Sequence, residues 1–91
     1  MNLQFRRHAR NRMRLYGVVE SDVTDCIEQP EWSEQEVAPS KVFIHAFSDG
    51  AGIRWKRRVG RWLEVIYIDE DDNRVIITVG PRNDDPPEDS R

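Results

Sequence analysis

The feature of the sequence that most constrains the fold is a pair of apolar segments on either side of an acidic turn. Residues 61–68 (RWLEVIYI) are almost continuously apolar, which is typical of a strand that is covered on both faces of a sheet. Residues 74–80 (RVIITVG) follow the turn at 69–73 (DEDDN), so we expect the two segments to pair as an antiparallel hairpin. A sheet therefore forms the centre of the predicted fold.

Two further strands are expected upstream of this hairpin. Residues 41–47 (KVFIHAF) are rich in β-branched and aromatic side chains and precede a Gly-rich turn at 48–52. Residues 53–59 (IRWKRRV) alternate apolar and basic side chains, and Gly60 ends the segment. The pattern predicts a four-stranded, mainly antiparallel sheet, with residues 30–40 as a connector.

Two helices are expected ahead of the sheet. An apolar stripe at helical spacing predicts a helix over about 4–16 that stops at Gly17, and its members are Phe5, Ala9, Met13 and Tyr16. A second helix, capped by Ser21 or Asp22, is predicted over about 21–28. The fold class is therefore α+β, with both helices packed on the sheet.

The composition fits one small domain. The chain has 91 residues, and we assign 1–81 to an α+β domain and 82–91 (RNDDPPEDSR) to a disordered acidic tail. The single cysteine, Cys26, excludes an internal disulfide, and the first residues carry no apolar signal segment, so we expect a cytoplasmic protein. No apolar run approaches the roughly 20 residues that span a bilayer, so no membrane association is expected.

The charges are distributed in blocks. The formal net charge is -3, yet arginines gather in residues 1–20 and 54–62 while acids dominate 21–53 and 63–91. Because charges on a protein surface are screened over roughly 10 Å, a local basic patch can bind a polyanion on an acidic protein. RNA is therefore an admissible partner.

The first basic block contains a histidine and an arginine at helical spacing. His8 and Arg12 are four residues apart, so they share a helix face, while Arg7 and Arg14 lie on neighbouring faces and could contact a nucleic-acid backbone. A histidine can transfer protons near neutral pH and a guanidinium can hold a phosphate, which together suit phosphodiester cleavage. The alternative is a solvated helix with a packed histidine.

The second basic block lies on the predicted strand 53–59. Arg54, Lys56 and Arg58 alternate on one face and could follow a nucleic-acid backbone if that face is open. Alternatively, they guard a sheet against edge pairing. Arg57 lies on the opposite face beside Trp55, where it extends to solvent, pairs with an acid such as Glu64 or lines a pocket.

Two strand residues complete the candidate site. Glu64 interrupts an apolar strand face and could act as a general base or orient His8, although a buried ion pair would also explain it. Thr78 could position a phosphate with its hydroxyl, or it is an ordinary strand residue. The soft ligands Cys26, His8 and His45 lack zinc-site spacing, so neither a metal nor another cofactor is expected.

The sequence resembles a bacterial family of small domains of unknown function. The matching pieces are His8-Ala9 with Arg12-Met13, Gly17-Val18, Glu20 to Val23, Pro30, Gly60 with Leu63 and Val65, and Val75-Ile76 with Thr78-Val79. That family looks like a branch of the RelE/BrnT-type toxin fold, within the barnase, colicin and RelE group of metal-independent ribonucleases. The resemblance implies a RelE-like fold and an antitoxin-like inhibitor as partner. It implies a site of His8, Arg12 and Thr78, with an arginine of 54–58 on the phosphate.

Three hypotheses follow for the function. The first is a metal-independent endoribonuclease of toxin type that cleaves RNA phosphodiester bonds. The second is a non-catalytic module on the same fold that binds a nucleic acid or an acidic protein. The third is a homo-oligomer whose interface is anchored by Trp32, Trp55 or Trp62.

Overall fold

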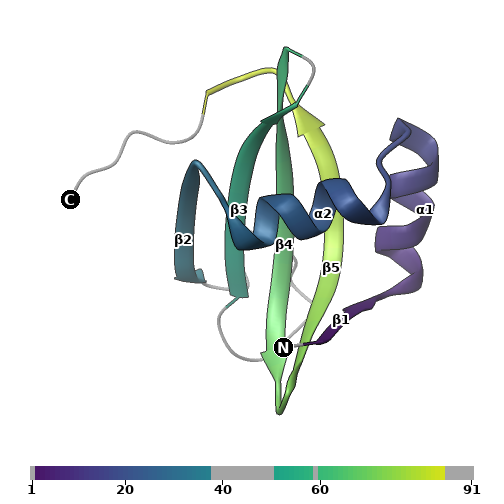
Figure 1. Cartoon of the computed structure of the whole chain (residues 1–91), viewed down its shortest axis with the longest axis vertical. Helices are drawn as coiled ribbons and strands as arrows, with labels where there is room; N and C mark the ends of the chain where they lie inside the picture. Colours follow the sequence, from purple (N-terminus) through teal and green to yellow (C-terminus); the bar gives the residue numbers. More distant parts are fainter. Residues whose placement is uncertain (1, 38–50, 59, 86–91) are drawn as a thin grey trace.

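The computed structural model describes residues 2–37, 51–58 and 60–85, and it is an α+β fold with two helices and a five-stranded mixed sheet (Figure 1). In chain order the elements are β1 (Asn2–Phe5), α1 (Arg7–Tyr16), α2 (Glu20–Glu28), β2 (Trp32–Val37), β3 (Ala51–Arg58), β4 (Arg61–Glu70) and β5 (Asn73–Arg82). The strand order is β1-β5-β4-β3-β2. The α+β class is confirmed, whereas the expected four-stranded sheet is replaced by one of five strands.

The predicted hairpin is confirmed as β4 and β5, which pair antiparallel from Trp62 and Arg82 at one end to Glu70 and Asn73 at the other. A bulge between Ile66 and Tyr67 shifts the register within this pair. β3 pairs antiparallel with β4, which makes β4 the central strand expected from its apolar sequence.

Two strands were not predicted. β1 runs parallel to β5 and includes Phe5, which the sequence had suggested was helical. The prediction was wrong because a four-residue strand is too short to show its two-residue period beside the longer helical stripe. β2 lies within the expected connector 30–40 and pairs antiparallel with β3 at the edge of the sheet, and its sequence WSEQEV is mostly polar. The predicted strand 41–47, with His45, lies outside the described residues.

Both helices end or begin at local signals in the sequence. α1 ends at Gly17, whose φ of 68° is left-handed and whose N–H donates to the carbonyl of Met13. α2 begins at Glu20, and the Asp22 carboxylate accepts the N–H of Val19 at 3.1 Å in place of a Ser cap. α1 begins at Arg7 rather than at residue 4, because β1 takes up the residues before it.

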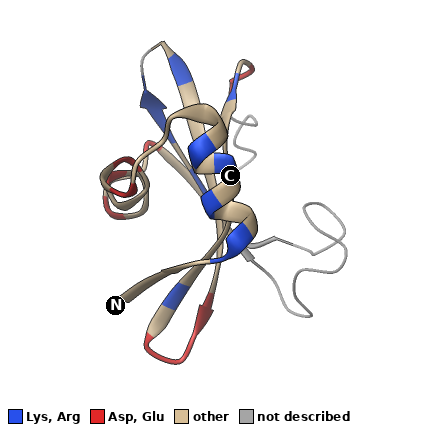
Figure 2. Cartoon of the chain, turned by 90° about the vertical axis from the view of Figure 1, so that its right-hand side faces the viewer, with Lys and Arg blue, Asp and Glu red and all other residues tan. Residues whose placement is uncertain are grey.

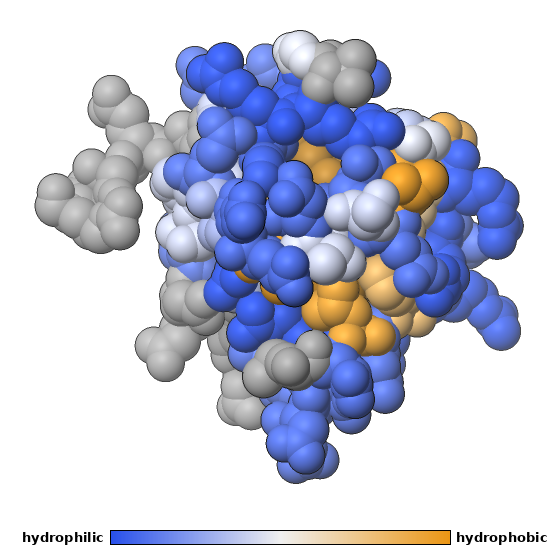
Figure 3. All heavy atoms as spheres, viewed as in Figure 1, coloured by the Kyte–Doolittle hydropathy of each residue, from blue (hydrophilic) through white to orange (hydrophobic). Residues whose placement is uncertain are grey.

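The hydrophobic core lies between the two helices and one face of the sheet. α2 crosses that face and α1 lies beside β5 (Figures 1 and 2). The core cluster consists of Ala9, Met13, Val18, Val23, Cys26, Ile27, Leu63, Val65, Tyr67, Ile76 and Val79. The exterior of this side is mostly hydrophilic, with some apolar residues showing between the polar ones (Figure 3).

Gly52 is required by the close approach of a buried ring. A Cβ atom at this position would lie 2.1 Å from Cζ of Tyr67, its cross-strand partner, whose side chain is 1% exposed. The ring therefore covers the backbone of β3 where any other residue would clash. Within the described ranges, neither helix is long and apolar enough to cross a membrane.

Candidate active site

The structure brings four of the five predicted catalytic residues to one hollow of about 270 Å³ beside the end of β5. His8 and Arg12 reach it from α1, Glu64 from β4 and Thr78 from β5. These elements meet because α1 packs against β5, while β5 pairs with β4 so that Gly80 is opposite Glu64. Arg82, which the sequence had placed in the acidic tail, is the last residue of β5 and also lines the hollow.

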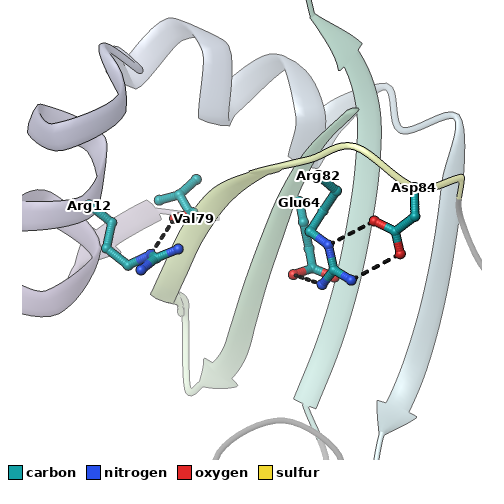
Figure 4. Close-up of polar contacts among 5 residues, drawn as sticks. All are labelled: Arg12, Glu64, Val79, Arg82 and Asp84. Carbon is teal, nitrogen blue, oxygen red and sulfur yellow. Dashed lines mark hydrogen bonds and ion pairs between the residues drawn. The ribbon is translucent and has the colours of Figure 1, made fainter. Parts of the chain in front are cut away.

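Arg12 is held in a fixed orientation. Its Nε–H donates to the carbonyl oxygen of Val79 at 3.0 Å (Figure 4), and its guanidinium carbon lies 5.0 Å from the ring centre of Tyr16. Gly80 makes room for this arrangement, since a Cβ there would lie 2.9 Å from Nη2 of Arg12. With Nε bound to the backbone, the Nη nitrogens are the part of the guanidinium that can bind an anion in the hollow.

Glu64 is a carboxylate in a partly desolvated position, with a side chain that is 17% exposed. Burial raises the pKa of Glu64, and the charge of Arg82 and the nearby Trp55 indole oppose this shift. Nη1 of Arg82 lies 3.5 Å from Oε1 of Glu64, while the buried Trp55 Nε1–H forms no hydrogen bond of normal geometry. Trp55 is the cross-strand partner of Glu64, so its indole is a close neighbour of the carboxylate. A carboxyl with a raised pKa is a better proton acceptor.

Arg82 connects this hollow to the segment after β5. Its Nε and Nη2 bind the two carboxylate oxygens of Asp84 at 3.1 and 3.0 Å, and the same residue reaches Glu64 (Figure 4). The hydrogen bonds to Asp84 raise the pKa of Arg82 and lower the pKa of the Asp84 carboxyl. Arg82 was not predicted as a site residue, because residues 82–91 were assigned to an acidic tail and Arg82 is in fact the last residue of β5.

His8 and Thr78 differ in how far they are exposed. His8 is an exposed residue in the first turn of α1, whereas Thr78 is 9% exposed in the middle of β5. Both line the hollow. An exposed imidazole at the rim can exchange its proton with solvent, and a hydroxyl on the wall can donate to a bound oxyanion.

Arg57 does not line this hollow. It is opposite Trp62 in the sheet register, and its guanidinium carbon lies 4.9 Å from the centre of that ring. Its backbone N–H donates to the Glu31 carboxylate at 2.7 Å. Glu64 is opposite Trp55, two residues before Arg57 in β3, and the ion pair of Glu64 is made with Arg82 instead.

The three alternating cations of β3 face α2 rather than an open surface. Lys56 pairs with Asp25 at 2.8 Å, and Arg58 pairs with Asp22 at 3.0 Å. Arg54 donates to the carbonyl of Ile27, near the end of α2. The expected open stripe of Arg54, Lys56 and Arg58 is therefore not formed, because the acids and the carboxyl end of α2 occupy that side of β3.

Two further observations complete the picture of the predicted site residues. Arg7 and Arg14 are exposed on α1 and do not line the hollow. In the part of the chain that the structure describes, no three His, Cys, Asp or Glu side chains gather closely enough to hold a metal ion. The candidate site thus consists of one histidine, one carboxylate, one hydroxyl and two arginines.

The fold and the hollow define a small α+β domain with a histidine, a carboxylate and two arginines at the end of its sheet. Residues 5–81 match a family described as a domain of unknown function (DUF4258), and the chain belongs to that family. No curated protein and no solved structure matches the chain. The expectation of a small domain of unknown function is thereby confirmed.

Proposed function

We propose that this domain is an endoribonuclease that cleaves RNA with its own side chains and without a metal ion. One observation carries the proposal: His8, Arg12, Glu64 and Arg82, from three different elements, line one hollow. Cleavage at a ribose phosphate requires a base, an acid and cations for the phosphate, and the hollow supplies each of these. The resemblance to RelE/BrnT-type toxins supports the same chemistry.

Arg12 and Arg82 are the phosphate-binding groups in this proposal. The Nη nitrogens of Arg12 point away from its bond to Val79, and Arg82 already binds one planar anion bidentately in the form of the Asp84 carboxylate. Phosphate presents paired oxygens of similar geometry, so it can take the place of that carboxylate. Two guanidiniums also stabilise the extra negative charge of the pentacovalent transition state.

Glu64 and His8 move the protons. The Glu64 carboxylate accepts the proton of the ribose 2′-hydroxyl, whose oxygen attacks the phosphorus and forms a 2′,3′-cyclic phosphate. The imidazolium of His8 gives its proton to the departing 5′-oxygen as the phosphorus–oxygen bond breaks. Glu64 then carries one more proton and His8 one fewer. Solvent takes the extra proton from Glu64 and returns one to the exposed His8 before the next turnover. Thr78 donates its hydroxyl hydrogen to a phosphate oxygen.

The test is cleavage of end-labelled single-stranded and structured RNA in EDTA by the parent protein and its variants. We expect His8→Ala to lower the rate by about 10²- to 10⁴-fold, as loss of a general acid does. Arg12→Gln is expected to lower it similarly. Arg10→Gln is the matched control, since Arg10 lies on the same helix but pairs with Glu20 at 2.5 Å outside the hollow. Intact RNA with every protein would contradict the proposal.

A toxin-type ribonuclease needs an inhibitor in the cell that makes it. We therefore propose an antitoxin-like protein as a partner, whose acidic side chains would bind Arg12 and Arg82 in the hollow. Binding of RNA by the parent protein without any cleavage would favour the second candidate function, a non-catalytic module on the same two arginines.

A further inference from the structure

A second hollow of about 270 Å³ adjoins the candidate active site at the end of the sheet where β3 meets β4. It is lined by Tyr16 from the end of α1 and by Trp62 from the start of β4. Leu63 faces the core, so the ring of its neighbour Trp62 points to the other face of the sheet, where it contacts Arg57 and Trp55. Tyr16 is therefore the aromatic ring of this hollow. Val18 and Leu63 give it an apolar floor, and Pro81 lines both this hollow and the first one. The shared Pro81 makes the two hollows neighbours.

Arginines stand at the mouth of this second hollow. Arg58 and Arg61 are opposite each other in the sheet, on either side of Gly60. Arg58 is neutralised by Asp22 and also donates to the carbonyl of Gly17 at 3.0 Å. Arg61 is exposed and forms no ion pair within the ranges that the structure describes. Its cation is therefore available to an anion that comes with the ligand.

The Tyr16 ring already contacts an arginine on one side. The guanidinium carbon of Arg12 lies 5.0 Å from its ring centre. Tyr16 nevertheless remains 39% exposed, so one side of its ring is accessible. A flat ligand with polar edges can pack against the remaining face of this ring.

We propose that this second hollow binds a base of single-stranded RNA next to the phosphate that is cleaved. An aromatic ring, an apolar floor and an unpaired arginine are the features that recognise a base together with its phosphate. Arg12 connects the two sites, because it lines the first hollow and contacts a ring of the second. This inference rests on the proposed function for the position of the scissile phosphate, and it assigns the neighbouring nucleotide to Tyr16 and Arg61.

The test is equilibrium binding of a fluorescein-labelled RNA hexamer of mixed sequence in which every 2′-hydroxyl is methylated. This probe cannot be cut through its 2′-oxygen, so fluorescence anisotropy reports binding alone. We expect Tyr16→Leu to weaken binding about tenfold, whereas Tyr16→Phe, which keeps the ring, stays within about twofold. Arg61→Gln is expected to lower the slope of log affinity against log salt by about 0.7, the value for one phosphate contact to a single strand.

Arg6→Gln is the matched charge control. Arg6 pairs with Glu70 at 3.7 Å, at the far end of β4 from this hollow, so its loss should leave that slope unchanged. Circular dichroism is used to check that each variant is folded. We expect folded variants, because Tyr16 and Arg61 are both exposed.

Two results would overturn the inference: no binding of the hexamer by the parent protein, or equal affinity of the parent and Tyr16→Leu. The proposed function fails separately. Binding that depends on Tyr16, together with no cleavage of unmodified RNA, would reject the ribonuclease and keep the base site. Cleavage together with unchanged affinity in Tyr16→Leu would reject the base site and keep the ribonuclease.

Discussion

Substitution of Gly80 by alanine separates the position of Arg12 from the stability of the fold. The new methyl carbon would lie 2.9 Å from Nη2 of Arg12, whereas carbon and nitrogen atoms in ordinary contact are about 3.5 Å apart. The guanidinium is the end of a flexible side chain, so it moves and the backbone stays. Arg12 is thereby shifted by roughly 0.5–1 Å, and its bond to Val79 is strained or lost.

The two expected effects differ in size. Displacement of a catalytic group by about 1 Å costs on the order of 100-fold in rate, so cleavage of RNA by Gly80→Ala should fall by about that factor. Stability changes less. The lost charge-assisted hydrogen bond costs about 1.5–3 kcal/mol, and alanine recovers about 0.4–1 kcal/mol by restricting the unfolded chain. The net loss in the free energy of unfolding is about 0.5–2.5 kcal/mol.

Single-turnover cleavage and urea denaturation measure the two effects on the same samples. Gly52→Ala is the contrasting variant, because its methyl group would lie 2.1 Å from the fixed ring of Tyr67 and should destabilise the protein by about 1–3 kcal/mol or more. Gly52 does not line the hollow, so the part of Gly52→Ala that stays folded should cut normally. Parental cleavage by folded Gly80→Ala would refute the role given to Arg12.

Three further predictions concern stability and reactivity. Because burial raises the pKa of Glu64 above its usual 4.5, the folded state holds this proton longer than the unfolded state, and stability falls as pH rises through that raised value. We therefore expect the urea midpoint of the parent protein to fall more between pH 4 and 7 than the midpoint of Glu64→Gln. Equal falls in the two proteins would contradict this prediction. Burial raises the pKa of Cys26 to about 12, so iodoacetamide at pH 8 should label the thiol only as fast as the protein unfolds; rapid labelling of the native protein would be inconsistent with this packing. Asp22→Ala loses the bond to the Val19 N–H and an ion pair, and should cost about 1–2 kcal/mol in chemical denaturation. This is more than the cost of Asp25→Ala, which loses only a partly exposed ion pair with Lys56.

The elements that the sequence predicted correctly are those whose periodicity is long enough to show. The hairpin of β4 and β5 has ten residues in each strand, and α1 and α2 have clear apolar faces with Gly17 between them. β1 has four residues and β2 is polar, so both are strands because of the neighbour they pair with rather than because of their own sequence. That information becomes visible only in the assembled sheet.

The candidate site could be predicted where local spacing determines it. His8 and Arg12 share a helix face through their spacing of four residues, and Glu64 is conspicuous as a carboxylate in an apolar strand. The strand arginine could not be chosen from the sequence. Arg57 in β3 and Arg82 in β5 are both cross-strand partners of Trp62, on opposite sides of β4. Because α1 lies beside β5, it is Arg82 that lines the hollow with His8 and Arg12.

The central claim is that the ribose 2′-hydroxyl, activated by Glu64, attacks the phosphorus while His8 protonates the departing 5′-oxygen. It is tested most directly by cutting RNA with the parent protein in EDTA and ¹⁸O-labelled water and determining the mass of the new 3′ ends at early times. The account predicts a 2′,3′-cyclic phosphate that contains no ¹⁸O, and no such product from His8→Ala. New ends that carry ¹⁸O from the first turnover, or the same product from His8→Ala, would contradict it.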